Sequence, residues 1–390
     1  MGVNSHRITS WLFESALPLW SNSGLDVTAG GFFDSLSING IPIKDENKRL
    51  RVQARQVYVY SHAYLMGWKP VSGGISPLEV AKHGFEFITS YYWRDEPGGF
   101  TYSVDRDGTI KDSRVELYEQ AFAIFSFAWY YRATGDERAI EMAIRTLEFI
   151  DLYLKDAKYG GYYENLSKDL PRRQNSHMHL FEALLALFKS TGDSEFVDRA
   201  VSIYELLSSR FIDNKTNTLG EFFDYNWAPA SGTSGLIVEP GHHYEWVWLL
   251  YQFESLGCIT DRSLAEKLYQ FAEKFGVEQT TEPTKGLIFD SVMRSGIDLD
   301  DNKRLWCQTE SIKAQTARIE LELDKTSETR LEFLLDRLFK LYLINDTGLW
   351  REHIARDGEP IRHSVPATSF YHLFIALTEV LRVRDGVDSI

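Results

Sequence analysis

The sequence predicts an all-α protein, an (α/α)6 barrel or toroid of twelve helices with short β ribs in the connecting loops. Three observations lead to this prediction. A turn motif of glycine followed by aromatic or large apolar residues recurs six times along the chain. An amphipathic helical pattern precedes each turn, and a more apolar helical pattern follows it. Repeats at a fixed spacing of this kind indicate one supersecondary unit used several times.

The turn motif begins with glycine and ends near an acidic residue. Its glycines are separated by 68, 62, 59, 66 and 62 residues. Three of the six have a preceding glycine or follow stretches rich in Pro, Asp or Asn, which is typical of turns. The aromatic residues after each glycine are expected to form the short extended ribs. The six copies are Gly31-Phe32-Phe33-Asp34, Gly99-Phe100-Thr101-Tyr102, Gly161-Tyr162-Tyr163-Glu164, Gly220-Glu221-Phe222-Phe223-Asp224, Gly286-Leu287-Ile288-Phe289-Asp290 and Gly348-Leu349-Trp350-Arg351-Glu352.

An amphipathic helix is expected before each turn. The two clearest examples both start at Thr-Gly-Asp, at residues 134–136 and 191–193, and run to about Tyr153 and Phe211. In the first, apolar residues recur at i, i+3 and i+4, which gives one apolar stripe. Comparable stretches occur at residues 76–92, 261–275 and 326–342, and more weakly at 7–20.

A second helix is expected after each turn, as at residues 122–131 and 246–253. These segments are apolar all round, so they should be buried on every side. Amphipathic outer helices around buried inner ones describe a closed toroid. Residues 1–390 are therefore expected to form a single domain, although the length alone would favour two. An open helical solenoid is the main competitor, but solenoids usually lack a matched number of polar insertions.

Composition excludes several classes of partner. The net charge is -14 and no Lys/Arg-rich run occurs, which argues against nucleic acid or an anionic membrane as a partner. Two cysteines cannot make a disulfide framework or a cysteine metal cluster in a chain of this length. No apolar stretch approaches a membrane span and no secretory signal is visible, so we expect a cytoplasmic protein. The sequence leaves open whether the protein forms a homo-oligomer.

Polar residues gather about twenty residues after each glycine, where the inner helices should begin. In a toroid these helix starts converge at one end of the barrel, and His, Glu and Arg from different repeats would meet there as a site requires. The six windows contain Arg55, Tyr118-Glu119-Gln120, Asn175-Ser176-His177-Met178-His179, His242-His243-Tyr244-Glu245, Trp306-Cys307-Gln308-Thr309-Glu310 and Tyr371-His372.

Each candidate also has a structural explanation. Arg55 could cap or pair with neighbouring helices. His177 and His179 lie two residues apart, about 200° around a helix, so one of them should be structural. His242 and Glu245 share one helical face and could form a merely stabilising hydrogen bond. His372 has the weakest local context of these residues.

Three alternative functions were weighed against the composition of these windows. His-x-His and His-x-x-Glu could bind zinc, but the sequence contains no His-Glu-x-x-His and no cysteine ligand set. A glycoside hydrolase could take its two carboxylates from Glu119, Glu245 and Glu310. A non-catalytic carbohydrate-binding scaffold would not need a charged, inward-pointing cluster. The excess of histidine instead favours proton transfer at a carbon next to a carbonyl, because imidazole takes and returns protons near neutral pH.

At the same windows the sequence resembles the N-acylglucosamine 2-epimerase superfamily over essentially the whole chain. The most specific string is Pro-Gly-His-x-x-Glu. The matching strings are Val52-Gln53-Ala54-Arg55-Gln56, the Asn-x-x-Met-His-x-x-Glu-Ala of Asn175 to Ala183, Pro240-Gly241-His242-His243-Tyr244-Glu245-Trp246, Trp306-x-Gln-x-Glu310 and Tyr371-His372. The resemblance implies an (α/α)6 barrel and a metal-independent sugar epimerase or aldose–ketose isomerase that needs no cofactor.

The resemblance also implies roles for individual residues. His372 corresponds to the base at C2, and His242 to the second acid/base, held by Glu245 and responsible for opening the sugar ring. Arg55 corresponds to the arginine that contacts the substrate oxygens at the reacting carbons. The remaining residues expected to bind the substrate or shape its pocket are His179, Asn175, Trp306, Tyr118, Phe122, Met178 and Glu310.

The branch of the superfamily is inferred from one short string. Cellobiose 2-epimerases carry Gly-His-Asp-Ile-Glu, whereas this chain has Gly-His-His-Tyr-Glu-Trp at residues 241–246, which looks more like the isomerases acting on free mannose. We therefore expect reversible conversion of D-mannose to D-fructose. A 2-epimerase of the mannose/glucose, cellobiose or N-acylglucosamine type is the alternative, and an aldose modified at C6 stays open as the substrate.

Overall fold

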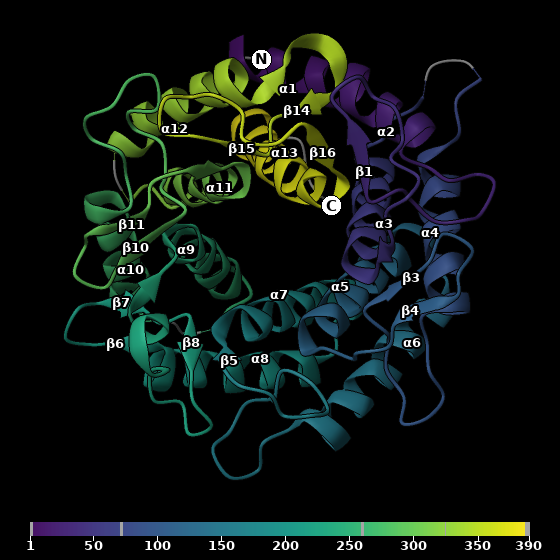
Figure 1. Cartoon of the computed structure of the whole chain (residues 1–390), viewed down its shortest axis with the longest axis horizontal. Helices are drawn as coiled ribbons and strands as arrows, with labels where there is room; N and C mark the ends of the chain where they lie inside the picture. The colour runs from purple at the N-terminus through teal and green to yellow at the C-terminus, as the bar shows by residue number, and fades with distance from the viewer. Residues whose placement is uncertain (1–2, 71–72, 259–260, 324, 387–390) are drawn as a thin grey trace.

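The chain forms an (α/α)6 barrel in which six inner helices surround a central lumen and an outer layer of helices encloses them (Figure 1). The structure is a computed structural model that describes residues 3–70, 73–258, 261–323 and 325–386. No helix in these ranges is long and apolar enough to cross a membrane.

Inner and outer helices alternate along the chain, as the repeat predicts. The inner helices are α3 (Leu50–Leu65), α5 (Leu117–Thr134), α7 (Gln174–Thr191), α9 (Pro240–Ser255), α11 (Leu305–Glu320) and α13 (Phe370–Asp385). The outer layer comprises α1 (Val3–Thr9) and α2 (Leu17–Ser23), joined by the π-helical segment Ser10–Ala16, then α4 (Pro77–Tyr91), α6 (Glu137–Phe149), α8 (Ser194–Leu206), α10 (Arg262–Phe275) and α12 (Thr326–Arg337). π-Helical turns at Ile150–Leu154, Leu207–Phe211 and Leu338–Tyr342 extend α6, α8 and α12.

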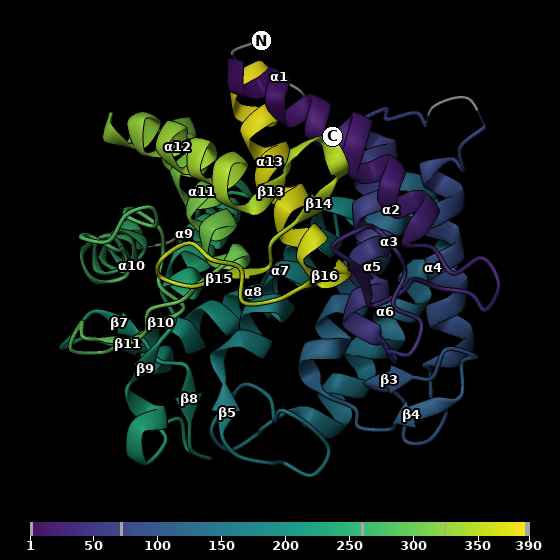
Figure 2. The ribbon, with the colours of Figure 1, turned by 45° about the horizontal axis from the view of Figure 1, so that its top comes forward.

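The strands are short, and those of the middle repeats lie at one end of the ring (Figure 2). They are the predicted ribs, and all pairings are antiparallel. Their bounds are β1 (Ser35–Ser37), β2 (Lys48–Arg49), β3 (Ser103–Val104), β4 (Ile110–Asp112), β5 (Arg172–Arg173), β6 (Ile212–Asp213), β7 (Thr218–Leu219), β8 (Phe222–Phe223), β9 (Ile237–Val238), β10 (Ser291–Met293), β11 (Asp298–Asp300), β12 (Lys303–Arg304), β13 (Leu343–Ile344), β14 (Leu349–Trp350), β15 (His353–Ile354) and β16 (Ser364–Pro366). Three 3-10 turns, Gly232–Leu236, Asn345–Thr347 and Ala367–Ser369, complete the connections.

Each glycine turn folds back on the end of the preceding outer helix. Five of the six motif glycines have positive φ, the exception being Gly220, and glycine adopts this conformation without steric cost. The residue after the turn then pairs with the chain that leaves the outer helix, for example Trp93 with Phe100 and Lys155 with Tyr162. The recurrence of the motif therefore reflects six copies of one helix-to-rib junction.

In five inner helices a polar side chain connects the glycine turn to the barrel. It lies three residues after the first residue of the helix. Gln120 of α5 accepts from the backbone N–H of Phe100 and donates to its carbonyl oxygen, both at 2.8 Å. Gln53 and Gln308 make the same pair of bonds. Because buried backbone groups must be hydrogen-bonded, these side chains fix the turn against the helix.

Two histidines replace glutamine at this position. His177 Nε2 accepts from the backbone N–H of Tyr162 at 2.9 Å, and His243 Nε2 accepts from that of Leu219 at 3.2 Å. Burial lowers the pKa of His177 to about 3 and that of His243 to about 4, so both rings are neutral acceptors. The prediction that one member of the His177/His179 pair is structural is confirmed by His177.

The acidic residue that ends the motif also has a defined function in the fold. Asp34, Glu164 and Asp290 each accept from the backbone N–H of the residue that precedes an inner helix. The outer helices have their own N-caps, since Asp136 accepts from the backbone N–H of Arg138 at the start of α6. A side-chain acceptor at a helix start is typically worth about 1 kcal/mol.

The ring closes where the first outer segment meets the sixth turn. Trp20 stacks on Trp350 with ring centroids 4.9 Å apart, and its indole N–H donates to the carbonyl oxygen of Gly348 at 3.1 Å. The β1–β16 pair joins the first and last repeats beside it. This closure distinguishes the molecule from the open solenoid that the repeat alone also allowed.

Candidate active site

The side chains that meet in the barrel mouth occupy repeated registers of the inner helices. Positions one, five and eight residues after the first helical residue share one helical face. The first of these registers provides Tyr118, Asn175, Trp306 and Tyr371, the second provides Arg55, Phe122, His179, Glu245 and Glu310, and the third provides Glu182 and Lys313. His242 and His372 both lie two residues after the start of their helices.

Arg55 is held by neutral groups. Its guanidinium donates to the hydroxyl of Tyr118 at 3.0 Å and to the carbonyl oxygen of Thr368 at 3.1 Å, and it lies 4.2 Å from the centre of the Phe122 ring. Among the described residues no carboxylate pairs with Arg55. Its charge is therefore free to attract a substrate oxygen, although the same bonds also join α3 to α5 and to the turn before α13, as the structural explanation of Arg55 proposed.

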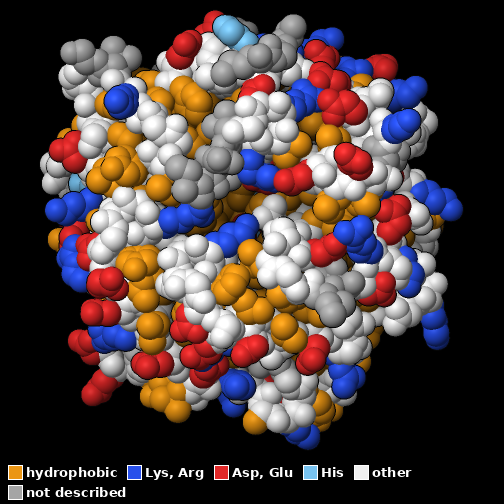
Figure 3. All heavy atoms as spheres, turned by 180° about the vertical axis from the view of Figure 1, so that it is seen from behind, with side chains coloured by type: hydrophobic (Ala, Val, Ile, Leu, Met, Phe, Trp, Pro, Cys, Tyr) orange, Lys and Arg blue, Asp and Glu red, His pale blue; other side chains and the backbone are white. Residues whose placement is uncertain are grey.

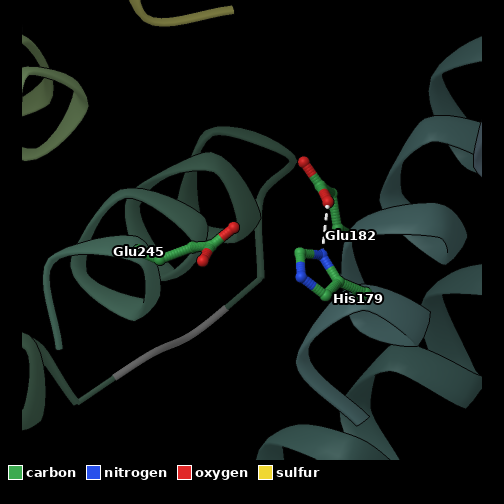
Figure 4. Close-up of side chains that lie close together, drawn as sticks. All are labelled: His179, Glu182 and Glu245. Carbon is green, nitrogen blue, oxygen red and sulfur yellow. Dashed lines mark hydrogen bonds and ion pairs between the residues drawn. The ribbon is translucent and has the colours of Figure 1, made fainter. Parts of the chain in front are cut away.

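His179 belongs to a cluster with two glutamates, shown in Figure 4. Its Nδ1 lies 3.1 Å from Glu182 Oε2, and Glu182 also accepts from the hydroxyl of Tyr371. Burial raises the pKa of Glu182, but the contacts with His179 outweigh it and hold that pKa below the usual value. Glu245 of α9 points toward this pair from the facing helix.

The partner of His242 differs from the one expected. His242 Nδ1 lies 2.9 Å from Glu221 and 3.7 Å from Glu239, so the expected His242–Glu245 hydrogen bond is wrong. Glu245 instead lies 3.9 Å from Lys313. Burial lowers the pKa of His242, but Glu221 and Glu239 outweigh it and raise that pKa to about 9. His242 is therefore an imidazolium at neutral pH.

His372 has the opposite protonation state. Its Nδ1 lies 2.8 Å from Glu310, and Lys313 lies 2.6 Å from the other oxygen of that carboxyl group. Burial and the positive charges of Arg55 and Lys313 lower the pKa of His372 well below its usual value. Burial and repulsion from Glu245 raise the pKa of Glu310, although Lys313 opposes the shift.

The two imidazoles both lie close to one indole ring. The Trp306 centroid is 4.8 Å from the ring of His242 and 6.0 Å from that of His372. Gly241 permits this packing, because a Cβ at that position would lie 2.5 Å from the Trp306 ring. The mouth therefore holds one protonated and one neutral imidazole around a flat apolar surface, as general acid and base catalysis requires.

The remaining expected residues are placed as follows. Asn175 is half-buried, and its Oδ1 has no hydrogen-bond partner among the described residues. Met178 is fully buried in the hydrophobic core. Tyr244, one of the residues used to infer the branch, donates to Glu273 of an outer helix at 2.9 Å. The string Gly-His-His-Tyr-Glu-Trp, which favoured an isomerase, differs from the epimerase string at His243 and Tyr244. Both of these side chains make contacts within the scaffold.

Sequence reasoning missed four charged residues of the site. Glu182, Glu221, Glu239 and Lys313 had no assigned role, although Glu182 lies within a quoted motif and Glu221 lies within the fourth turn. Aligning the six inner helices by their structural glutamine or histidine would have found Glu182 and Lys313, because both lie five residues after it. No such signal marks Glu221, whose contact with His242 joins residues 21 positions apart.

Three groups of side chains in the mouth have ligand atoms within 4.8 Å of one another and could hold a cation. They are His179–Glu182–Glu245, Glu221–Glu239–His242 and Glu245–Glu310–His372. Lys313 already neutralises the third group, and protonation of His242 opposes a metal in the second. The expectation of a metal-independent enzyme stays a prediction.

The chain is similar in sequence to known proteins over most of its length. A model of the family described as N-acylglucosamine 2-epimerase (GlcNAc 2-epimerase) matches residues 31–376. A mannose-6-phosphate isomerase of Rhizobium meliloti (strain 1021) is 34% identical over 396 residues, covering 97% of this chain and 98% of its own length. A cellobiose 2-epimerase of Bacteroides fragilis is 25% identical over 314 residues, covering 76% of this chain and 77% of its own length.

The architecture matches a solved structure as well. A crystal structure of a D-mannose isomerase superposes with a TM-score of 0.86 at 21% identity, covering 98% of this chain and 99% of that one. This likeness concerns the fold, which is the same (α/α)6 barrel. From the match over residues 31–376 and the R. meliloti relative, the chain belongs to the N-acylglucosamine 2-epimerase family and is an enzyme of the sugar isomerase and epimerase type.

Proposed function

We propose that the chain catalyses the reversible isomerisation of D-mannose to D-fructose through an enediolate. The observation that carries the proposal is the pair of imidazoles with opposite protonation states, His242 and His372, both close to Trp306. Opening the sugar ring needs a proton donor, and removing the proton from C2 needs a neutral base.

In this proposal His372 takes the proton from C2 and returns it to C1. In this proposal Glu310 is a carboxylate that accepts the Nδ1 proton of His372, which leaves Nε2 as the basic atom. Lys313 favours this form of Glu310, against burial and the charge of Glu245, which raise the pKa of Glu310. The electron pair of the broken C2–H bond forms the C1–C2 double bond of the enediolate. The proton of the O2 hydroxyl passes to O1, and reprotonation at C1 then leaves the carbonyl at C2 and a hydroxyl group at C1.

His242 and Arg55 act on the oxygens. The His242 imidazolium donates a proton to the ring oxygen when the cyclic sugar opens, and Glu221 stabilises its charged form. Arg55 stabilises the negative charge that develops on O1 or O2, since a preorganised cation aimed at developing charge lowers the barrier. Trp306 provides the stacking surface, and Asn175, Tyr118 and His179 position the hydroxyl groups.

Two other substrate assignments have specific support. The R. meliloti relative is named for mannose 6-phosphate, so the six-phosphate of mannose is the second candidate. The cellobiose 2-epimerase relative supports 2-epimerisation, which differs only in reprotonation on the other face of C2. Both reactions use the same two imidazoles.

The decisive experiment follows mannose and mannose 6-phosphate separately in deuterated water by NMR. Fructose or its phosphate carrying deuterium at C1 supports isomerisation. The substrate that reacts faster shows whether the enzyme prefers a free hydroxyl group or a phosphate at C6. Glucose labelled at C2 would replace the proposal by epimerisation. Failure to convert any free or phosphorylated aldose would refute both reactions.

Substitution of the two imidazoles tests their roles. We expect His242→Ala and His372→Ala each to lower kcat at least about 100-fold, because general acid–base groups contribute about 10² to 10⁴. His6→Ala, which removes an exposed histidine of α1, is the matched control. Near-wild-type turnover in either variant, with the fold intact by circular dichroism, would remove that residue from the mechanism.

A further inference from the structure

A second cavity occupies the opposite end of the barrel, where the inner helices end. It has a volume of about 510 Å³, within the usual range for small-molecule sites. Its wall comes from the C-terminal halves of the inner helices. Figure 3 shows this face, with hydrophobic side chains inside a central hollow and charged side chains around its rim.

Three cations and three carboxylates line this rear cavity, but two of the cations form no ion pair with those carboxylates among the described residues. Arg132, Lys189 and Arg382 all contribute to its wall. Both rim carboxylates, Glu320 and Glu379, bind Arg382. The charges of the other two cations are therefore left without a carboxylate partner on the rim.

The groups in direct contact with Arg132 and Lys189 are neutral. Lys189 donates to the side-chain oxygen of Gln252 at 2.7 Å, and Arg132 lies 5.0 Å from the centre of the Trp129 ring. In the described part of the chain neither cation has an ion-pair partner. Burial lowers the pKa of Lys189, the charges of Glu379 and Glu320 oppose this shift, and the charges of Arg132 and Arg382 add to it. An anion among these groups would relieve that repulsion.

The third carboxylate in the wall is already used elsewhere. Glu182 lies between this cavity and the catalytic mouth, where its two oxygens contact His179 and Tyr371. It therefore separates the two spaces and does not neutralise the rim. The rear cavity is built from different residues than the catalytic cluster, apart from this shared floor.

A buried polar group without a partner lies in the same wall. His62 is 3% exposed, and its Nε2 has no hydrogen-bond partner in the described structure. Its Nδ1 lies 3.0 Å from the Tyr58 hydroxyl, so only Nε2 is left for a further hydrogen bond. The Trp129 ring packs against His62 with centroids 4.4 Å apart and adds a flat apolar surface.

We propose that the rear cavity binds a small organic anion, a ring that carries a phosphate or carboxylate group. Arg132 and Lys189 bind the anionic group, because guanidinium and ammonium groups are strong donors to phosphate and carboxylate oxygens. Trp129 and the apolar wall contact the ring. This site is separate from the one that holds the sugar substrate.

Phenyl phosphate and benzoate are suitable probes, with phenol as the neutral analogue. Binding to the full chain is measured by calorimetry and by tryptophan fluorescence. We expect one of the anions to bind with a dissociation constant in the millimolar range or below, and phenol at least about tenfold more weakly, since loss of a charge-assisted contact costs about that much or more. Absence of binding by both anions would refute the proposal.

Variants locate the site. The double substitution Arg132→Gln and Lys189→Gln should weaken binding at least about tenfold, whereas Lys340→Gln, an exposed cation of the outer layer, should leave it unchanged. Arg55→Gln serves as the test for binding in the catalytic mouth. Binding that is lost in Arg55→Gln but retained in the double variant would place the anion in the catalytic mouth and overturn the proposal.

Discussion

Replacement of Glu221 by glutamine tests whether the charge of Glu221 keeps His242, the proposed acid, protonated. Glu221 Oε2 lies 2.9 Å from His242 Nδ1, and both residues are buried. Glutamine keeps the size and an oxygen acceptor but removes the negative charge. The substitution should therefore change the protonation of His242 while leaving the shape of the mouth intact.

The expected size of the effect follows from the pKa of His242. A rise from 6.5 to about 9 corresponds to about 3 kcal/mol in favour of the imidazolium, at 1.36 kcal/mol per pKa unit. Glu221 is the first of the charges that raise it, with Glu239 second. An opposite charge at this distance typically shifts a pKa by about 1 to 3 units. The pKa of His242 should fall by about 1 to 2 units in the variant.

The assay is the pH dependence of kcat/KM. In the native chain activity should fall on the alkaline side with an apparent pKa near 9, and in Glu221→Gln this fall should begin about 1 to 2 pH units earlier. Glu141→Gln, an exposed carboxylate of α6, is the control. An unchanged alkaline limb in a folded Glu221→Gln variant, whatever its rate, would refute the assignment of His242 as the acid.

The same pKa has a consequence for stability. Because the folded-state pKa of His242 is raised, its contribution is fully present below 6.5 and is lost as the pH rises through about 9. The free energy of unfolding of the native chain should therefore fall between these values, and Glu221→Gln should fall less steeply. Denaturant unfolding at several pH values measures the difference.

Three further predictions concern the scaffold and the chemistry. Gln120→Leu leaves the buried backbone N–H and carbonyl of Phe100 without their partner and should lower the free energy of unfolding by about 2 to 4 kcal/mol, whereas Leu at exposed Gln279 should change it little in denaturant titrations. Burial raises the pKa of Glu352 to about 7, so its contribution to stability is present below about pH 4.5 and is lost as the pH rises through 7. Glu352→Gln should therefore raise Tm more at pH 8.5 than at pH 5.5, whereas the exposed control Glu359→Gln should not. Equal changes in Tm at the two pH values would contradict this. Prolonged treatment with a chelator should leave turnover intact, and a loss that zinc restores would show that a metal is required.

Much of the fold could be predicted because its signals are local. Turn glycines, Thr-Gly-Asp junctions and apolar periodicity depend on residues close in sequence. The expected helix 76–92 is one residue longer than α4 at each end, and the expected helix 261–275 starts one residue before α10. The Thr-Gly-Asp string proved to serve two helices at once, with Gly135 in the left-handed conformation that ends α5 and Asp136 capping α6.

The site was less predictable because its contacts join different repeats. His242 was assigned to Glu245 since i and i+3 are neighbours on a helix, but the closer carboxylate, Glu221, comes from the turn before α9. Lys313 lies three residues after Glu310 in α11, but its second carboxylate neighbour, Glu245, comes from α9. Spacing within one helix cannot reveal which charge arrives from a neighbouring segment, and the protonation states depend on those charges.

The scaffold ties of Gln53, Gln120, His177, His243 and Gln308 have an evolutionary consequence. They lie three residues after the start of their helices, whereas the mouth is lined from positions one, two, five and eight, so the residues that hold the turns and those that line the mouth are separate sets. Mutation at the second set can change the chemistry without loosening the ring. A laboratory-evolution library restricted to those positions should therefore retain a high fraction of folded members while sampling new substrates.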